Sequence, residues 1–400
     1  MRQNEKLTER NHDRALGCLV GGAVGDALGY AIEFEQWPYI RNTYGEKGIT
    51  RYQLAGNGKA LISDDTQMTL FTSAGILLGM TRGHMRGIMG RIDTYCHWTY
   101  LDWLHTQEWD LRKPKERSDS WLMDVPELYA HRAPGNTCLS ALKSLENNKD
   151  PQNNSCGCGG VMRTAPLAIL DYLHGYADAE YEYCDMVAAE AARITHKHPL
   201  GFLPSAVLND ILMQIFDGEI DRGTSLSDIV HNAIKRLPSI KSETDKDRTY
   251  GELWPDEVAT LRRLLKYAME LTVRDIPDHV AIEKIGGGWT GHEALAIAIY
   301  SAVKHSNNFE NAIVSSVNHS GDSDSTGAIC GNIMGALLGR NAIPDYYTKD
   351  LELIDIIEEM AEDLFTGCII SEYMERDTPE TRRWFEKYCL FKWIPKCSNN

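Results

Sequence analysis

The chain has 400 residues, 43% hydrophobic and 24% charged, so it can bury a large core and does not have the composition of a disordered or fibrous protein. Its 57 Asp and Glu against 41 Lys and Arg give a formal net charge of -16, which repels nucleic-acid backbones and anionic membrane surfaces. A small stapled scaffold is excluded, and neither nucleic acid nor membrane is expected as a partner. The acidity favours metal cations, basic proteins and cationic substrates.

The cysteines and the N-terminal segment indicate the cellular compartment in which we expect the protein. Ten cysteines are too sparse for a secreted disulfide framework, and Cys156 and Cys158 lack a second close pair for a zinc site. Residues 1–14 mix acidic and basic side chains, unlike a signal peptide. Asp26 interrupts the one apolar stretch that approaches a membrane span in length. We expect a cytoplasmic protein with reduced thiols.

Periodic segments predict an all-α fold. Strand-like alternation is scarce, and Gly48–Leu54 is its best and short example. Loops are expected at Arg112–Ser120, Asn147–Gly160 and Pro238–Gly251. Apolar residues at three- and four-residue spacings predict helices at Thr66–Met80, Met186–Ile194, Ser205–Phe216, Asp256–Leu271, Glu293–Val303 and Leu351–Leu364.

Two stripes of glycine lie near opposite ends of the chain. Each stripe would leave one side of a helix bare, so that another backbone can approach closely. A membrane dimer uses the same spacing, but Asp26, Asn332 and the short apolar lengths argue against it. Because glycine costs about 1 kcal/mol per helical position relative to alanine, the stripes predict two tightly packed core helices. The stripes are Gly17, Gly21, Gly25 and Gly29, and Gly327, Gly331, Gly335 and Gly339.

The first acidic motif, Ser63–Thr66, precedes an amphipathic run. One interpretation is a helix start, with Asp64 as N-cap and Gln67 completing a capping box. The other is a metal site, because Ser63, Asp64 and Asp65 supply three oxygen side chains on one turn, as hard divalent cations require.

The second acidic motif, Gly321–Gly327, leads into the second glycine stripe. Capping would explain Asp324 but not Asp322 as well. If the two motifs meet, four carboxylates share one volume, and their pKa values must rise or about two divalent cations must bind. More than 250 residues separate the motifs, so the spacing does not show that they meet.

Two further segments are less specific. Ser155–Arg163 is a glycine-rich turn that either cradles phosphate with backbone N–H groups or is a plain turn. His196 and His198 resemble a metal pair, but side chains two residues apart diverge on a helix and Pro199 is expected to end one. Hydrogen-bonding or solvated histidines are therefore favoured over zinc ligands.

Acidic and aromatic residues in two other loops leave alternatives open. Glu33 and Glu35 follow the first glycine stripe, and either is a surface charge or a general base. Gly286–Trp289 is a flexible loop with one large ring, which either packs in the core or stacks on a ligand.

Taken together and in this order, these motifs resemble the ADP-ribosylglycohydrolase family. The resemblance spans roughly residues 14–340 and implies one all-α domain around a two-metal cleft that holds Mg²⁺ or Mn²⁺. It is carried by Gly22–Gly29 with Glu33, Ser63–Thr66, Gly159–Arg163, Thr195-His196, Gly286–Trp289 and Gly321–Ser325.

The resemblance also implies roles for single residues. Glu33, Asp65 and Asp324 are the expected catalytic residues. Gly159 and Gly160 would bind the diphosphate, His196 the ADP-ribose, and Trp289 the adenosine. The expected metal ligands are Ser63, Asp64, Asp65, Asp322, Asp324 and Ser325.

The activity that the resemblance implies is hydrolysis of the N-glycosidic bond between ADP-ribose and a protein side chain. Ser63, Ser325 and the Gly25–Tyr30 segment resemble the arginine-directed branch. The partner would then be an ADP-ribosylated protein. The alternative is an immunity-type binding protein that neutralises an ADP-ribosyltransferase toxin by direct contact, with or without hydrolysis.

The motif span also predicts the domain organisation. Residues 14–340 form the glycohydrolase-like domain, with an insertion around 220–254. Residues 1–13 form a polar N-terminal extension that is either disordered or docks on a partner. Residues 341–400 form a helical C-terminal extension that packs on the same domain.

Overall fold

The computed structural model describes residues 8–108, 118–173, 181–373 and 378–393, and within these ranges it contains helices and no strand. The predicted all-α fold is therefore confirmed. The α-helices are α2 (Glu9–Tyr30), α3 (Trp37–Tyr44), α4 (Asp64–Arg86), α5 (Ile92–Gln107), α6 (Asn136–Glu146), α7 (Ala165–Leu173), α8 (Tyr181–Arg193), α9 (Pro199–Phe216), α10 (Leu226–Arg236), α11 (Tyr250–Leu253), α12 (Pro255–Leu271), α13 (Asp278–Ile285), α14 (Gly291–Lys304), α15 (Phe309–Val317), α16 (Ser323–Leu338), α17 (Asp345–Thr348), α18 (Ile354–Thr366) and α19 (Pro379–Tyr388).

The six predicted helices correspond to α4, α8, α9, α12, α14 and α18. The observed helices begin and end at residues that differ from the predicted ones, and the start of α9 shows how a capping residue sets the bound. α9 begins at Pro199 because the His198 side chain accepts a hydrogen bond from the Leu200 N–H at 3.1 Å and acts as N-cap. Proline is well suited to the first helical position, so the expectation that Pro199 ends a helix is wrong.

Gly48–Leu54, the best example of strand-like alternation in the sequence, forms no strand, because its backbone bonds to side chains instead of a neighbouring strand. Asn318 accepts a hydrogen bond from the Ile49 N–H at 2.7 Å and donates one to the Ile49 carbonyl at 2.9 Å. The Tyr347 hydroxyl donates to the Thr50 carbonyl. These bonds satisfy the backbone locally, and no ladder forms.

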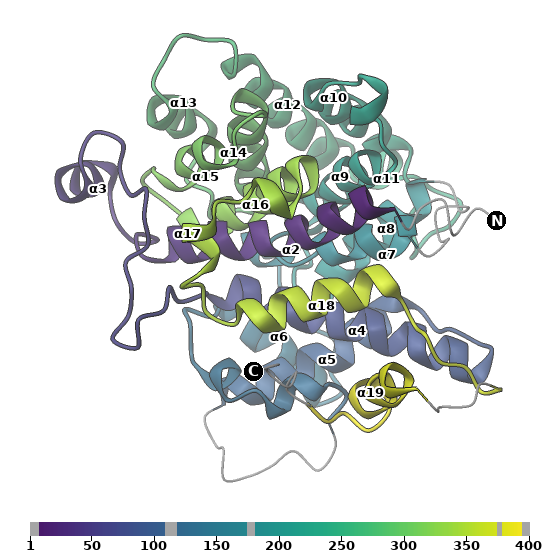
Figure 1. Cartoon of the computed structure of the whole chain (residues 1–400). Coiled ribbons are helices and arrows are strands. Elements are labelled where there is room, and N and C mark those ends of the chain that lie inside the picture. Colours follow the sequence, from purple (N-terminus) through teal and green to yellow (C-terminus); the bar gives the residue numbers. More distant parts are fainter. Residues whose placement is uncertain (1–7, 109–117, 174–180, 374–377, 394–400) are drawn as a thin grey trace.

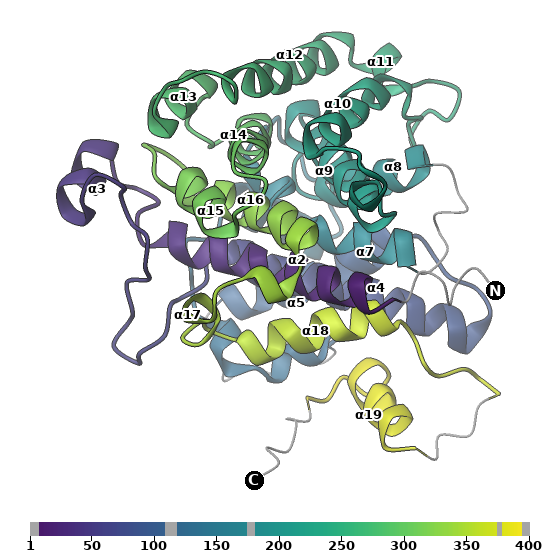
Figure 2. The ribbon, with the colours of Figure 1, turned by 45° about the horizontal axis from the view of Figure 1, so that its top comes forward.

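The two glycine stripes face each other. α2 and α16 lie side by side (Figures 1 and 2), and a Cβ added at Gly21 or Gly25 would lie under 3.0 Å from the carbonyl oxygen of Gly331 or Gly327, respectively. Gly17 faces Gly335 in the same way, so the helices run antiparallel. The predicted tight helix pair is confirmed.

Gly339 differs from the other glycines of its stripe. It follows the last residue of α16 with a φ of +88° and lies against the Asp13 carboxylate. This positive φ favours glycine, so Gly339 ends the helix and does not pack within it.

Several helices pack directly on the α2–α16 pair. α18 contacts α2 and α4, while α14 and α15 pack on α16. α3 stands apart from this body in Figure 1. The start of α4 is held from the far end of the sequence: Ala60 exchanges backbone hydrogen bonds with Asp350 and Glu352, and Glu352 accepts from the Ile62 N–H.

Among the described helices, α9 is long and apolar enough by composition to cross a membrane, but 89% of its window is buried inside the protein. It is a core helix that contacts α7, α8 and α14. The expectation that Asp26 interrupts the one apolar stretch of that length therefore overlooked α9.

The described part of the N-terminal extension is folded on the body. Residues 9–13 belong to α2, with Thr8 as N-cap. Arg10 pairs with Asp221, and the Asp13 carboxylate accepts a hydrogen bond from the Asn341 N–H at 3.1 Å. Residues 1–7 lie outside the described residues, so the structure does not test whether they bind a partner.

We expect Gly25→Ala to destabilise the protein strongly, because the new methyl group would overlap the backbone at Gly327 and neither helix can yield without separating. Overpacking of this kind typically costs about 1–3 kcal/mol, and backbone contact places this variant at the upper end. Chemical denaturation measures it. Gly56→Ala is the control, because an added Cβ meets no atom within 4 Å there; equal stability of the two variants would contradict the packing.

Three buried carboxylates lie where α7, α8 and α9 pack, away from the glycine pair. Asp171, Asp185 and Asp210 are each at most 3% exposed. Arg236 donates to Asp210 at 2.8 Å, and Asn209 donates to Asp185 at 3.1 Å. Burial raises the pKa of Asp171 to about 7, and burial followed by the charge of Asp210 raises the pKa of Asp185 well above its usual range.

This cluster predicts that stability falls as pH rises from about 4 to about 7. The folded protein holds a proton on Asp171 that the unfolded chain has already lost, so raising the pH favours unfolding. Asp171→Asn should flatten this slope and add about 2 kcal/mol at pH 8. Urea denaturation across the pH range checks it, with the exposed Glu283→Gln as control; an unchanged slope in Asp171→Asn would contradict the assignment.

Candidate active site

The first acidic motif forms the N-terminus of α4. Ser63, not Asp64, is the N-cap, and its hydroxyl accepts from the Asp65 N–H at 3.2 Å. Asp64 and Asp65 occupy the first turn, and Asp64 accepts from the Gly135 N–H at 3.2 Å. The predicted capping box is therefore wrong: Gln67 donates instead to the Ala130 carbonyl.

Asp26 caps α4 from another helix, a role that the sequence did not suggest. Its carboxylate accepts hydrogen bonds from the Ser63 N–H at 3.0 and 3.1 Å, from the Thr66 N–H at 3.1 Å and from the Thr66 hydroxyl. Asp26 is fully buried in the glycine-striped α2. It therefore joins α2 to the metal motif and fixes the direction in which α4 begins.

The second acidic motif forms the N-terminus of α16. Asp322, not Asp324, is the N-cap, although both carboxylates accept from the Ser325 N–H, at 3.3 and 2.9 Å. The Asp322 N–H donates to the Gly287 carbonyl at 2.8 Å, and the Cys158 thiol lies 2.8 Å from the other Asp322 oxygen. Asp322 thus connects three separate loops.

The antiparallel glycine contact brings these parts together, because the end of α2 lies against the start of α16. Gly29 faces Ser323, and Glu33 follows directly after α2. The result is a single cleft that contains most of the residues predicted from the sequence. It is lined by Glu33, Asp64, Asp65, Ala133, Gly135, Asn136, Thr137, Cys138, Gly157, Cys158, Gly159, Met162, His196, Trp289, Asp322, Asp324 and Ser325.

Two predicted site residues lie beside the cleft and do not line it in the described structure. Ser63 is fully buried under Asp65, and its hydroxyl bonds to Asp324. Gly160 packs on α9, where a Cβ would meet the Gly201 carbonyl. Ser63 therefore orients two of the expected ligands, and Gly160 sets the position of the turn.

Burial, followed by repulsion between carboxylates, sets the electrostatics of the cleft, and no Lys or Arg is among the described lining residues. Burial, followed by the charges of Asp324, Asp322 and Asp64, raises the pKa of Glu33 to about 10. Burial and Asp324 also raise the pKa of Asp65 well above its usual range and that of Asp26 to about 7. The fold thus holds these carboxyl groups close together, with no Lys or Arg side chain in the described lining to neutralise them.

The donor set fits hard divalent cations. Asp65 Oδ2 and Glu33 Oε2 are buried and have no hydrogen-bond partner, and carboxylate and hydroxyl oxygens are the ligands of Mg²⁺ and Mn²⁺. Within the described ranges, no three His, Cys, Asp or Glu side chains already surround one point as a closed site.

Another part of the cleft wall is a glycine-rich turn, in which Gly157 and Gly159 flank the Cys158 side chain that contacts Asp322. A Cβ at Gly159 would lie 3.0 Å from Cys138 Sγ and from His196 Cε1. His196 is 2% exposed, and its Nδ1 lies 2.9 Å from the Thr195 hydroxyl. Burial and the charge of Arg163 lower the pKa of His196 to about 3, so the ring is neutral.

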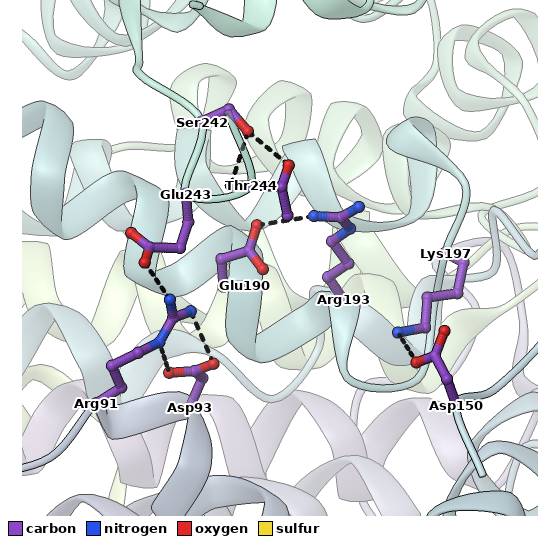
Figure 3. Close-up of polar contacts among 9 residues, drawn as sticks. All are labelled: Arg91, Asp93, Asp150, Glu190, Arg193, Lys197, Ser242, Glu243 and Thr244. Carbon is purple, nitrogen blue, oxygen red and sulfur yellow. Dashed lines mark hydrogen bonds and ion pairs between the residues drawn. The ribbon is translucent and has the colours of Figure 1, made fainter. Parts of the chain in front are cut away.

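Hydrogen bonds and ion pairs hold this histidine segment in place. Asn153 accepts from the Lys197 N–H and donates to the Thr195 carbonyl at 2.9 Å. Lys197 pairs with Asp150 at 3.2 Å (Figure 3). Figure 3 also shows two separate sets of ion pairs nearby, Glu190 with Arg193 at the end of α8, and Arg91 with Asp93 and Glu243. The two bonds of Asn153, on either side of His196, thereby fix the position of this histidine relative to the glycine-rich turn.

Two aromatic rings stand at the rim of the cleft. Trp289, which lines it, is 46% exposed and stacks on Phe34 with ring centroids 5.9 Å apart. Phe34 is 70% exposed and directly follows Glu33. Trp289 therefore does not pack in the core, and a flat group can stack here.

Comparisons with known proteins agree with the motifs. The sequence model of the family described as ADP-ribosylglycohydrolase matches residues 7–372. The chain belongs to the ADP-ribosylglycohydrolase family. It is 23% identical to the ADP-ribosylhydrolase ARH1 of Dictyostelium discoideum, over 90% of this chain and 97% of that protein. It is 25% identical to the ADP-ribosyl-[dinitrogen reductase] glycohydrolase of Rhodospirillum rubrum, over 86% and 91%.

A solved structure shares the fold of this family member. A protein described as an ADP-ribosylglycohydrolase-related protein complex superposes with a TM-score of 0.60 and 21% identity, covering 90% of this chain and 99% of that one. The family and the named relatives support an activity on ADP-ribose linkages.

We expect Mg²⁺ to stabilise the protein and Asp65→Asn to abolish this effect. Asp65→Asn also removes one of the repelling carboxylates, so it should melt no lower than the wild type without metal. At about 100 times its Kd, a cation that binds only the folded state adds about 2.7 kcal/mol. Thermal melts with and without Mg²⁺ measure both effects. Glu35→Gln, outside the cleft lining, is the control; an undiminished Mg²⁺ shift in Asp65→Asn would contradict the assignment.

Proposed function

We propose that this ADP-ribose glycohydrolase hydrolyses the N-glycosidic bond between ADP-ribose and an arginine side chain, with two Mg²⁺ or Mn²⁺ ions in the acidic cleft. The observation that carries the proposal is the convergence of the two acidic motifs, through Asp64 and Asp65 from one and Asp322, Asp324 and Ser325 from the other, in one cleft whose described lining has no Lys or Arg. The substrate would be an ADP-ribosylated protein.

The expected metal ligands are Ser63, Asp64, Asp65, Asp322, Asp324 and Ser325. Bound cations would supply Lewis-acid polarisation of the ribose and a more acidic water at neutral pH. The hydroxyl of Ser63 bonds to Asp324 and accepts from the Asp65 N–H, so it presents one carboxylate from each motif to the same volume.

Glu33, Asp65 and Asp324 would handle the protons. Glu33 and Asp65 each keep a buried oxygen without a partner, which can accept a proton from water or return one to the leaving nitrogen. Asp324 is held by the Ser325 N–H and by Ser63, so its direction is fixed. These groups orient the water and the departing guanidine.

The glycine-rich turn at Gly157–Gly160 and His196 would bind the diphosphate and ADP-ribose. A side chain at position 159 would crowd Cys138 and His196. Glycine at this position therefore leaves the backbone open to a ligand. Trp289, exposed at the rim, would stack on the adenosine or another flat group.

Three observations support arginine as the modified residue. Ser63 and Ser325 resemble the arginine-directed branch of the family. The exposed ring of Phe34, which directly follows Glu33, suits a guanidinium group by cation–π attraction. The acidic residues of the cleft, with no Lys or Arg in its described lining, also favour a cationic leaving group.

The toxin-neutralising alternative would use the N-terminal extension and the C-terminal tail to contact the toxin. Residues 9–13 are engaged in α2 and its contacts, and nothing in the part of the chain that the structure describes favours a toxin as partner. Hydrolysis is therefore the function we propose.

The decisive assay offers arginine-linked and serine-linked ADP-ribosyl proteins with Mg²⁺ and measures free ADP-ribose. We expect release from the arginine linkage, loss in EDTA, and a decrease of about 100-fold or more in Asp324→Asn, because this carboxylate serves both metal and proton transfer. A melt of Asp324→Asn shows that it is folded. Full activity in EDTA would reject the metal mechanism, and release from serine alone would reject the arginine preference.

A further inference from the structure

Arg163 is a fully buried guanidinium group behind the glycine turn. Its Nη2 donates to the Thr195 hydroxyl at 2.7 Å, its Nη1 lies near the Met68 and Cys138 sulfur atoms, and the group stacks over Tyr100. These described contacts contain no carboxylate. A charge buried without an ion pair is unfavourable, so its place next to the cleft calls for a physical explanation.

The direction of the hydrogen bonds follows from the chemistry of arginine. A guanidinium group has only donors, so the Thr195 oxygen must accept from Arg163. The one hydroxyl proton of Thr195 is then directed to His196 Nδ1 at 2.9 Å, since the alternative acceptor, the Ala192 carbonyl, lies at 3.5 Å. His196 Nδ1 is therefore an acceptor, and in a neutral ring the proton sits on Nε2.

The protonated nitrogen faces the cleft. His196 lines it, and Cβ atoms added at Gly157 and Gly159 would lie 3.2 and 3.4 Å from Nε2. Burial and the Arg163 charge keep the ring uncharged at neutral pH. In the opposite tautomer, a lone pair on Nε2 would face the turn and repel an anionic oxygen there.

We propose that Arg163 and Thr195 are positioning residues that hold His196 as the Nε2–H tautomer, so that the turn offers an uncharged N–H donor to a diphosphate oxygen of the ligand. The identity of that ligand rests on the proposed function; the tautomer does not. Arg163 thus acts on the cleft indirectly. It orients the Thr195 hydroxyl, which selects the His196 tautomer and so places an N–H donor in the cleft.

The test reads the tautomer directly, by two-bond ¹H–¹⁵N correlation spectra of protein labelled with ¹⁵N-histidine. His196→Asn identifies the His196 signals by their loss. We expect the wild type and Thr195→Ser to carry the proton on Nε2, and Thr195→Val to lose this preference because its methyl group cannot donate to Nδ1. Thr164→Val is the matched control, since Thr164 is a buried threonine next to Arg163 that bonds to the Val161 carbonyl.

A binding measurement completes the test. ADP-ribose should bind about tenfold more weakly to Thr195→Val than to the wild type, with Thr195→Ser and Thr164→Val within about twofold of it, as expected for one hydrogen bond to a charged acceptor. A wild-type His196 protonated on Nδ1 or on both nitrogens would overturn the inference. So would a Thr195→Val protein with unchanged tautomer and affinity. Because neither readout needs turnover, a protein that hydrolyses no ADP-ribosyl bond would refute the proposed function alone.

Discussion

The direct contact between the α2 and α16 backbones is the constraint on which the site depends. With glycine at each crossing point, the helices approach until carbonyl groups of one lie where side chains of the other would be. The end of α2 then reaches the start of α16, so Glu33 lies near Asp322 and Asp324. A wider spacing would separate the two acidic motifs, and the glycine penalty is offset by this placement.

The cleft built on that contact is electrostatically unfavourable by itself. Several buried carboxylates repel one another, and the described groups that approach them are backbone N–H groups, hydroxyls and a thiol. Asp26 differs from the others because its oxygens are fully used in capping α4. It therefore serves as structural support, while Asp65 and Glu33 keep unpartnered oxygens for chemistry. The large apolar core compensates for the repulsion, and bound cations would relieve it.

The sequence predicted much of this because the relevant signals are local. The glycine spacing, the two acidic motifs and the amphipathic periods each occupy a short window. Other features depend on distant partners. Asp26, inside an apolar helix, suggested only that the helix does not cross a membrane; its role as a cap became visible when α4 was placed beside it. Gly48–Leu54 alternates like a strand but forms none, because Asn318 and Tyr347, more than 250 residues away, satisfy its backbone. Arg163 was visible only as part of a turn, and its connection to Thr195 required the fold.

The pairing of residues 17–29 with residues 323–335 also bears on how the protein is made. During synthesis, the first glycine helix leaves the ribosome long before its partner exists, and closing so long a loop is slow compared with local helix formation. The cleft cannot assemble until nearly the whole chain has emerged. A nascent or prematurely terminated chain that ends before α16 therefore lacks Asp322 and Asp324, two of the five carboxylates that line the cleft, and its acidic site is incomplete.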